Sequence, residues 1–251
     1  AIFRWYQSFF QDQSVFDSNN TWLYGGFLNL VVHLLHRLTG FDVYEVGHLC
    51  NAIVGLLGVV AAYKVGCLLG GSRAGLLAAV FLVLTPRYYG HSFNNPRDIP
   101  FAVFYLWSIF YILCGIREIP NVSVKTLVGT GLLVGLTLGI RAGGVILIVY
   151  YFMFYGIRYA TLIYSDRSLW SECCKKFVRQ ASVVGLISYV TMLVFWPWSQ
   201  LHPVSGILDA VQTFASFPDV HYSYFEGHYV GNDEIPWYYA SKWLILTLPE
   251  F

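Results

Sequence analysis

Hydrophobic residues follow one another in long runs along the chain, and short polar segments separate these runs. The runs cover about Val46–Leu69, Ala74–Thr85, Ile99–Ile116, Val124–Ile140, Val145–Ile163, Ala181–Trp198 and the start of a further one, Trp237–Leu248. Because a helix needs about 20 mainly apolar residues to cross a bilayer, most of these runs predict membrane-spanning helices. The run from Ala74 is short, so we expect it to continue through Arg87–Tyr89 at the membrane surface.

The segment Trp22–Leu38 precedes the first full run and has a different, amphipathic pattern. Its apolar residues recur at helical spacing, whereas Asn29, His33, His36 and Arg37 cluster on the other face. This pattern predicts a helix that lies in the outer membrane interface; a helix packed at the rim of the bundle fits equally well. The predicted fold class is all-α, a polytopic transmembrane helix bundle with an outer interfacial amphipathic helix.

Composition supports a membrane protein and excludes other classes. Of the 251 residues, 57% are apolar and only 12% are charged, against about 25% charged residues in soluble domains. The formal net charge of +1 excludes nucleic-acid binding through a basic surface. The chain starts without Met and stops inside an apolar run. We therefore interpret residues 1–251 as a single membrane-embedded module that is truncated at both ends.

Lys and Arg residues are distributed unevenly between the two sides of the predicted bundle. The richer side holds Lys64, Arg73, Arg117, Lys125 and the cluster within Arg158–Arg179, and the positive-inside rule makes it cytoplasmic. All 7 His residues and most carboxylates fall on the other side. Side chains able to transfer protons or bind sugars are thus expected on the extracytoplasmic face, although longer outer loops would also explain this distribution.

Glycines recur at every fourth position in one apolar run, at Gly131, Gly135 and Gly139. This spacing is typical of helices that approach each other closely in lipid. No glycine-rich nucleotide loop, either G-x-x-x-x-G-K-[ST] or G-x-G-x-x-G, occurs in the sequence. The chain therefore has no visible site for a soluble nucleotide.

The segment Thr85–Phe101 holds the most informative polar residues. Arg87, His91, Arg97 and Asp98 crowd between two apolar runs, and ionisable groups at a membrane boundary are functional candidates. Arg guanidinium groups bind phosphate oxygens bidentately, and Tyr89 suits stacking on a sugar ring. The alternative is a simple hairpin turn, which Gly90, Asn94, Asn95 and Pro96 would form while Asp98 caps the next helix.

Further candidates lie on the same predicted side. Arg141, in a glycine-rich turn, is either an anion ligand or an interface anchor, and Glu226 and His228 belong to an aromatic segment, Ser199–Tyr239, which suits carbohydrate recognition. A solvated loop with an aromatic belt is the alternative there. The spacing of His221, Glu226 and His228 does not match a zinc helix. The sequence therefore predicts no definite cofactor and leaves open whether a divalent metal binds. Asp17 is either a site carboxylate or a helix cap.

The turn Asn95-Pro-Arg-Asp-Ile-Pro-Phe101, the loop Gly139-Ile-Arg-Ala-Gly-Gly144 and the order of spans carry a resemblance. The chain resembles the GT-C superfamily of membrane glycosyltransferases, and is similar to protein O-mannosyltransferases and lipid A aminoarabinose transferases. The resemblance covers about Phe10 to Trp243. It is specific at the turn and diffuse elsewhere.

This resemblance implies inverting transfer of a sugar from a polyprenyl-phosphate-linked donor to a protein, lipid or glycan acceptor at the extracytoplasmic face. It implies a general-base Asp in the first outer loop, which is either upstream of residue 1 or one of Asp12 and Asp17, with Asp17 the candidate. It also implies a second catalytic carboxylate near the start of a later span, a position that Asp98 matches. The implied substrate-binding residues are Arg97, Arg87, His91, Asn95, Tyr89, Arg141, Glu226 and His228. The site would face the periplasm in a bacterial inner membrane or the lumen of the endoplasmic reticulum. A secondary transporter and a non-catalytic subunit of a membrane assembly are the alternatives.

Overall fold

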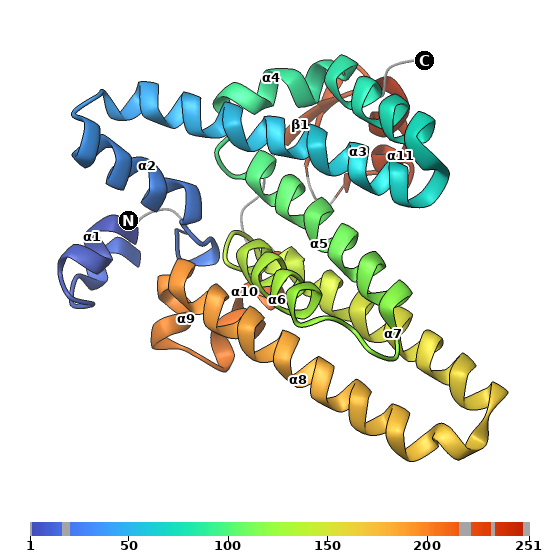
Figure 1. Ribbon diagram of the computed structural model, residues 1–251. Coiled ribbons are helices and arrows are strands. Elements are labelled where there is room, and N and C mark those ends of the chain that lie inside the picture. The colour runs from blue at the N-terminus through green and yellow to red at the C-terminus, as the bar shows by residue number, and fades with distance from the viewer. Residues whose placement is uncertain (1, 17–20, 216–221, 232–233, 248–251) are drawn as a thin grey trace.

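The computed structural model describes residues 2–16, 21–215, 222–231 and 234–247, and shows a bundle of long helices (Figure 1). The helices are α1 (Ile2–Gln7), α2 (Phe27–Thr39), α3 (Val43–Leu84), α4 (Pro86–Asn94), α5 (Asp98–Glu118), α6 (Val124–Leu138), α7 (Val145–Ser165), α8 (Trp170–Phe195), α9 (Pro197–Leu201), α10 (Ser205–Ala215) and α11 (Tyr239–Thr247). The short 3-10 turns are η1 (Gln13–Phe16), η2 (Thr21–Leu23), η3 (Ala142–Gly144) and η4 (Arg167–Leu169), and the strands are β1 (Tyr222–Phe225) and β2 (His228–Gly231). The all-α prediction is confirmed.

Helix α3 contains the first two predicted spans and reverses direction between them (Figure 1). The reversal is at Gly71, whose φ of 81° is in the left-handed region that glycine adopts without strain. The two arms then lie against each other so closely that a Cβ on Gly66 would come within 2.7 Å of the Gly75 Cα. Glycine thus makes both the turn and the close contact beside it.

Helix α4 lies along the first arm of α3, where a turn was predicted. Pro86 occupies the first turn of α4, a position that tolerates proline because no backbone donor is needed there. The Tyr88 hydroxyl donates to the Gly55 carbonyl at 2.6 Å, and the Asn51 amide donates to the His91 carbonyl at 2.9 Å. These contacts with α3 stabilise a helix through Asn94, so the expected hairpin turn is confined to the residues just before Asp98.

Helices α6 and α8 pack through the glycines that the sequence singled out. A Cβ on Gly131 would come within 2.7 Å of the Ile187 Cβ, and one on Gly135 within 2.5 Å of the Ser188 carbonyl oxygen. The Ser188 hydroxyl donates to the Gly131 carbonyl at 3.1 Å. The prediction of a close helix–helix contact is confirmed, and α8 is the partner.

Among the described residues, four helical segments are long and apolar enough to cross a membrane: Val43–Leu84, Asp98–Glu118, Ala142–Ser165 and Arg167–Phe195, while Val124–Leu138 is shorter. The last of the four begins well before the predicted start at Ala181. Its buried residues Cys173, Gln180, Val184, Ser188 and Met192 recur at helical spacing and continue one face through the polar stretch. Hydropathy alone missed this stretch because its other faces are charged.

The segment Ser199–Tyr239 contains regular structure that the sequence did not predict. It includes α10 and an antiparallel hairpin in which Tyr222 pairs with Gly231 and Phe225 with His228. The turn residues Glu226 and Gly227 have φ angles of 52° and 91°, as a two-residue primed turn requires. Helix α2 was predicted; it buries Leu28 and Val32 and exposes Leu38, and its place in the membrane interface stays a prediction.

Candidate active site

Asp98 and Arg141 meet at one end of the bundle although they are far apart in the sequence. Helix α5 begins at Asp98, and α6 returns antiparallel to it and ends just before Arg141. The hairpin of these two helices brings the Arg141 Nη2 to 2.6 Å from the Asp98 Oδ1. The sequence placed both residues on the same side of the membrane, and the ion pair confirms that they share one end of the bundle.

Asn95 fixes the position of the Asp98 carboxylate. Its side-chain oxygen accepts from the backbone N–H of Asp98 at 2.9 Å, and its amide donates to the Asp98 Oδ2 at 2.8 Å. The first contact caps α5, because the opening N–H groups of a helix have no partner within it. Asn95 and Arg141 therefore hold the two carboxylate oxygens from opposite sides.

Tyr24 connects the two arginines of this site. The Arg97 guanidinium carbon lies 4.7 Å from the centre of the Tyr24 ring, and that of Arg141 lies 5.4 Å from it, within the range of cation–π attraction. Tyr24 also forms a backbone bridge with Arg141. The next residue, Gly25, is so close to Gly139 that a Cβ would overlap its carbonyl oxygen. Tyr24 is not among the residues predicted from the sequence; the adjacent glycine pair was the available signal.

The site has more hydrogen-bond donors than acceptors. The side chains of Asp98 and Arg141 are 54% and 37% exposed, and Arg97 is exposed beside them. Within the described part of the chain, the buried Arg141 Nε and Trp198 Nε1 have no hydrogen-bond partner. A cavity of about 50 Å³ is lined by Tyr24, Arg97, Trp198 and neighbouring residues. Two guanidinium groups against one carboxylate make this end suited to an anionic ligand.

Comparison with known families assigns the chain that carries this site to a family. The family model of dolichyl-phosphate-mannose-protein mannosyltransferases matches residues 27–198, which include Asp98, Arg97 and Arg141. The chain belongs to this family. It is therefore a membrane glycosyltransferase of the mannosyltransferase type, as the resemblance of the turn and of the glycine-rich loop indicated. No curated protein and no solved structure matches the chain.

Three predicted site residues of this mannosyltransferase family member lie on α4, where their contacts in the described chain are local, and their part in substrate binding stays a prediction. Arg87 is at the start of α4 and exposed, and Tyr89 is 59% exposed and packs edge-on against Phe93. The His91 ring lies 3.4 Å from the Asn94 side-chain oxygen. At about 1.5 Å per residue, the helix places Arg87 more than two turns away from Asn95.

Glu226 lies in the turn between β1 and β2, and His228 is the first residue of β2. Lys242 forms an ion pair with Glu226, and the Tyr238 hydroxyl donates to the same carboxylate at 3.3 Å. The hydrogen bond from Lys242 lowers the pKa of Glu226. Glu226 therefore contacts α11 and the segment before it, whereas His228 pairs with Phe225 of β1. Their predicted part in substrate binding stays a prediction.

The remaining predictions concern Asp17 and a metal ion. Asp17 lies outside the described residues. Within the described ranges, no three His, Cys, Asp or Glu side chains come together in a group that could hold a metal ion. The site residues that the structure brings together are thus Asn95, Arg97, Asp98 and Arg141, with Tyr24 added.

Proposed function

We propose that this glycosyltransferase moves a sugar from a polyprenyl-phosphate-linked donor to a hydroxyl-bearing acceptor at the extracytoplasmic membrane face. The observation that carries the proposal is the Asp98–Arg141 ion pair with the exposed Arg97 beside it. The family description names dolichyl phosphate mannose as the donor of its members, so mannose is the first sugar to test. The acceptor class, whether protein, lipid or glycan, is left to the assay.

The two arginines suit the departure of a lipid phosphate. As the bond between the sugar C1 and the phosphate oxygen breaks, negative charge builds on the phosphate, and fixed positive charge lowers the barrier to that step. Arg97 and Arg141 supply this charge, and the unpartnered Nε of Arg141 is a further donor. We infer that the phosphate binds between these guanidinium groups and that the Tyr24 ring orients them.

Asp98 suits the role of the base that takes the acceptor proton. A carboxylate has about four acceptor positions, and Asn95 and Arg141 fill one on each oxygen. The carboxylate can therefore also accept the acceptor hydroxyl, whose oxygen attacks the sugar C1 while its proton passes to Asp98. Asp17 is the second candidate for this role. In the product, the sugar is bonded to the acceptor oxygen, and the polyprenyl phosphate carries the charge.

The distribution of cations supports an extracytoplasmic site. The end of the bundle opposite Asp98 carries Lys125, Arg167, Lys175, Lys176 and Arg179. Cytoplasmic loops are enriched in Lys and Arg, so the Asp98 end would face the periplasm or the lumen of the endoplasmic reticulum. A polyprenyl donor fits this arrangement because its tail stays in the bilayer while its phosphate reaches the surface.

The test is transfer of radiolabelled mannose from a polyprenyl phosphate mannose by the purified chain in liposomes. We expect Arg141→Gln to reduce transfer by about 10²-fold or more, the size of loss seen when one stabilising donor of a transition state is removed. Lys125→Gln removes the same charge at the other end and should retain transfer. Transfer that Arg141→Gln leaves intact would refute this site, and solute flux without transfer would support a transporter.

A further inference from the structure

A second cavity lies between α7 and α8, at the end of the bundle away from Asp98. It has a volume of about 710 Å³, and its lining is mostly apolar, with Gly156, Tyr159 and Phe177 along the groove and Arg167 and Trp170 at one end. None of these residues belongs to the Asp98 site. The groove therefore needs an explanation that the proposed transfer reaction does not provide.

The position of the groove matches one leaflet of a bilayer. Helix α7 runs for 21 residues from Val145, which follows the Arg141 loop, to Ser165. At about 1.5 Å per residue this is about 30 Å, the thickness of the hydrocarbon core. Tyr164 and Trp170 are 87% and 63% exposed, as aromatic residues at a membrane–water interface usually are. Arg167 thus lies at headgroup depth, and the groove extends from it toward the hydrocarbon.

Arg167 is a cation without a counter-ion among the described residues. Of the nearby carboxylates, Glu172 pairs with Lys176 at 2.5 Å, whereas Asp166 accepts from the Ser168 N–H at 2.9 Å and keeps its charge without forming an ion pair with Arg167. Further cations on the same two helices are Arg158, Lys175 and Arg179. Positive charge therefore exceeds negative charge around the mouth of the groove.

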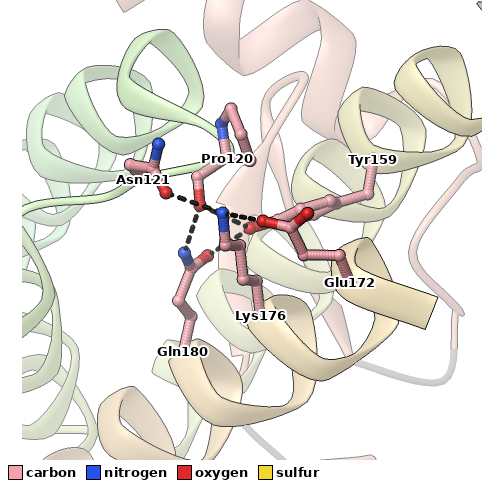
Figure 2. A network of polar contacts seen from close by, with 6 residues as sticks. All are labelled: Pro120, Asn121, Tyr159, Glu172, Lys176 and Gln180. Carbon is pink, nitrogen blue, oxygen red and sulfur yellow. Dashed lines mark hydrogen bonds and ion pairs between the residues drawn. The ribbon is translucent and has the colours of Figure 1, made fainter. Parts of the chain in front are cut away.

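The groove is built on fixed side chains. The Tyr159 hydroxyl donates to the Gln180 Oε1 at 2.9 Å, and the Gln180 amide donates to the Pro120 carbonyl at 3.1 Å, as Figure 2 shows. The Tyr159 and Phe177 rings pack edge-on with centres 5.6 Å apart. A Cβ on Gly156 would meet no atom within 4 Å, so the absence of a side chain there leaves the groove open.

We propose that this groove binds an anionic phospholipid of the surrounding bilayer, with the lipid phosphate on Arg167 and one acyl chain between Gly156 and Phe177. The combination of an apolar channel with an unpaired cation at headgroup depth matches the two parts of such a lipid. The excess of positive charge around the mouth selects an anionic headgroup over a zwitterionic one. The lipid would lie between α7 and α8 and contact both helices, away from the sugar-transfer site.

Native mass spectrometry of the detergent-solubilised chain tests the proposal. The probes are phosphatidylglycerol and phosphatidylcholine with the same acyl chains, and the wild-type chain should retain the first more strongly. Arg167→Gln should lower retention of phosphatidylglycerol about fivefold, the effect of one cation near an anionic surface. Arg73→Gln, which makes the same charge change on an exposed side chain of α3 outside the groove, should leave retention nearly unchanged.

A second variant tests the apolar part of the groove. Gly156→Leu fills the open space and should lower retention of both lipids. Equal retention of the two lipids by the wild type, or equal losses in Arg167→Gln and Arg73→Gln, would overturn the proposal. If Gly156→Leu instead separated a dimer and left lipid retention unchanged, the groove would be a contact between two copies of the chain. Melting temperatures of all variants separate these results from misfolding.

Discussion

The two ends of the helix bundle both gather polar side chains, but they differ in how these side chains are satisfied. Around Pro120, the amide of Gln180, the hydroxyl of Tyr159 and the ammonium of Lys176 all have partners, as Figure 2 shows. Around Asp98, the Arg141 Nε and Trp198 Nε1 lack partners within the described residues, where the Arg97 guanidinium contacts the Tyr24 ring and forms no ion pair. Buried polar groups normally pair, so the unpaired donors at the Asp98 end, the open end, point to a ligand, whereas the paired network around Pro120, at the closed end, points to stability. The Tyr155 hydroxyl beside Gly115 is an exception at the closed end, because it has no partner among the described residues.

The comparison predicts that a change at the open end reduces activity and leaves stability nearly intact. Asp98→Asn keeps the size of the side chain and removes the charge. We expect sugar transfer to fall by about 10²- to 10⁴-fold, the usual contribution of a general base, while the melting temperature changes little because Asp98 is half exposed. Transfer of labelled sugar and thermal unfolding, measured on one preparation, check both parts.

A large loss of stability in Asp98→Asn would contradict this distinction between the ends. It would mean that the Asp98–Arg141 pair holds α5 and α6 together. The matched control is Glu172→Gln, because Glu172 is 61% exposed and forms an ion pair with Lys176 at the closed end. That variant should retain full transfer and nearly full stability, as exposed ion pairs usually contribute little.

At the closed end, the opposite outcome is expected. Gln180 is 1% exposed and joins Tyr159 to the Pro120 carbonyl. Gln180→Leu removes both hydrogen bonds of Gln180 and leaves the Tyr159 hydroxyl and the Pro120 carbonyl only their direct contact at 3.3 Å, which should cost about 0.5–1.5 kcal/mol per lost bond. Unfolding by titration with a denaturing detergent should show this lower free energy of unfolding. Sugar transfer per folded molecule should stay unchanged. The double variant with Tyr159→Phe should lose less than the sum of both changes; strict additivity would show that the network is not coupled.

Much of the bundle could be predicted from the sequence because hydropathy and glycine spacing are local signals. The apolar runs predicted the spans, and Gly131 and Gly135 predicted a close helix contact that proved to join α6 and α8. The start of α8 was missed because its buried face continues through a charged stretch to Cys173. The β1–β2 hairpin was missed because Glu226–Gly227 is a weaker turn signal than Asn–Gly.

The candidate site could be predicted only in part, for a related reason. Asp98 and Arg97 are neighbours in the sequence, and Arg141 is assigned to the same side by counting spans. Tyr24 reaches them only through the backbone bridge and the close approach of Gly25 to Gly139. The contact of Gly25 with Gly139 joins segments that are far apart in the sequence, so no local sequence pattern predicts it. Arg87, in contrast, was predicted to belong to one polar cluster with Asp98. The structure places it in the first turn of α4, at the other end of that helix from Asn95.

Tyr24 offers a smaller test of the open end. Tyr24→Leu removes the ring that lies against both guanidinium groups, and a cation–π contact at an exposed site contributes about 0.5–1 kcal/mol. We expect the KM for the lipid-linked donor to rise a few-fold with a smaller change in kcat, because the arginines lose orientation and keep their charge. Tyr24→Phe keeps the ring and should resemble the wild type; an equal effect of both variants would assign the role to the hydroxyl.

The smallest expected effect concerns the β1–β2 hairpin, which belongs to neither end of the comparison by its contacts. Lys242 lowers the pKa of Glu226 below its ordinary value. The ion pair therefore stabilises the hairpin fully above the ordinary glutamate pKa of about 4.3, and this contribution is lost as the pH falls through the lowered pKa. Amide exchange of Tyr222–Phe225 should be faster in Glu226→Gln than in the wild type at about pH 6, above that ordinary pKa. The difference should vanish in acid. If Glu226→Gln also abolished sugar transfer at neutral pH, the result would show that the hairpin takes part in the transfer site around Asp98.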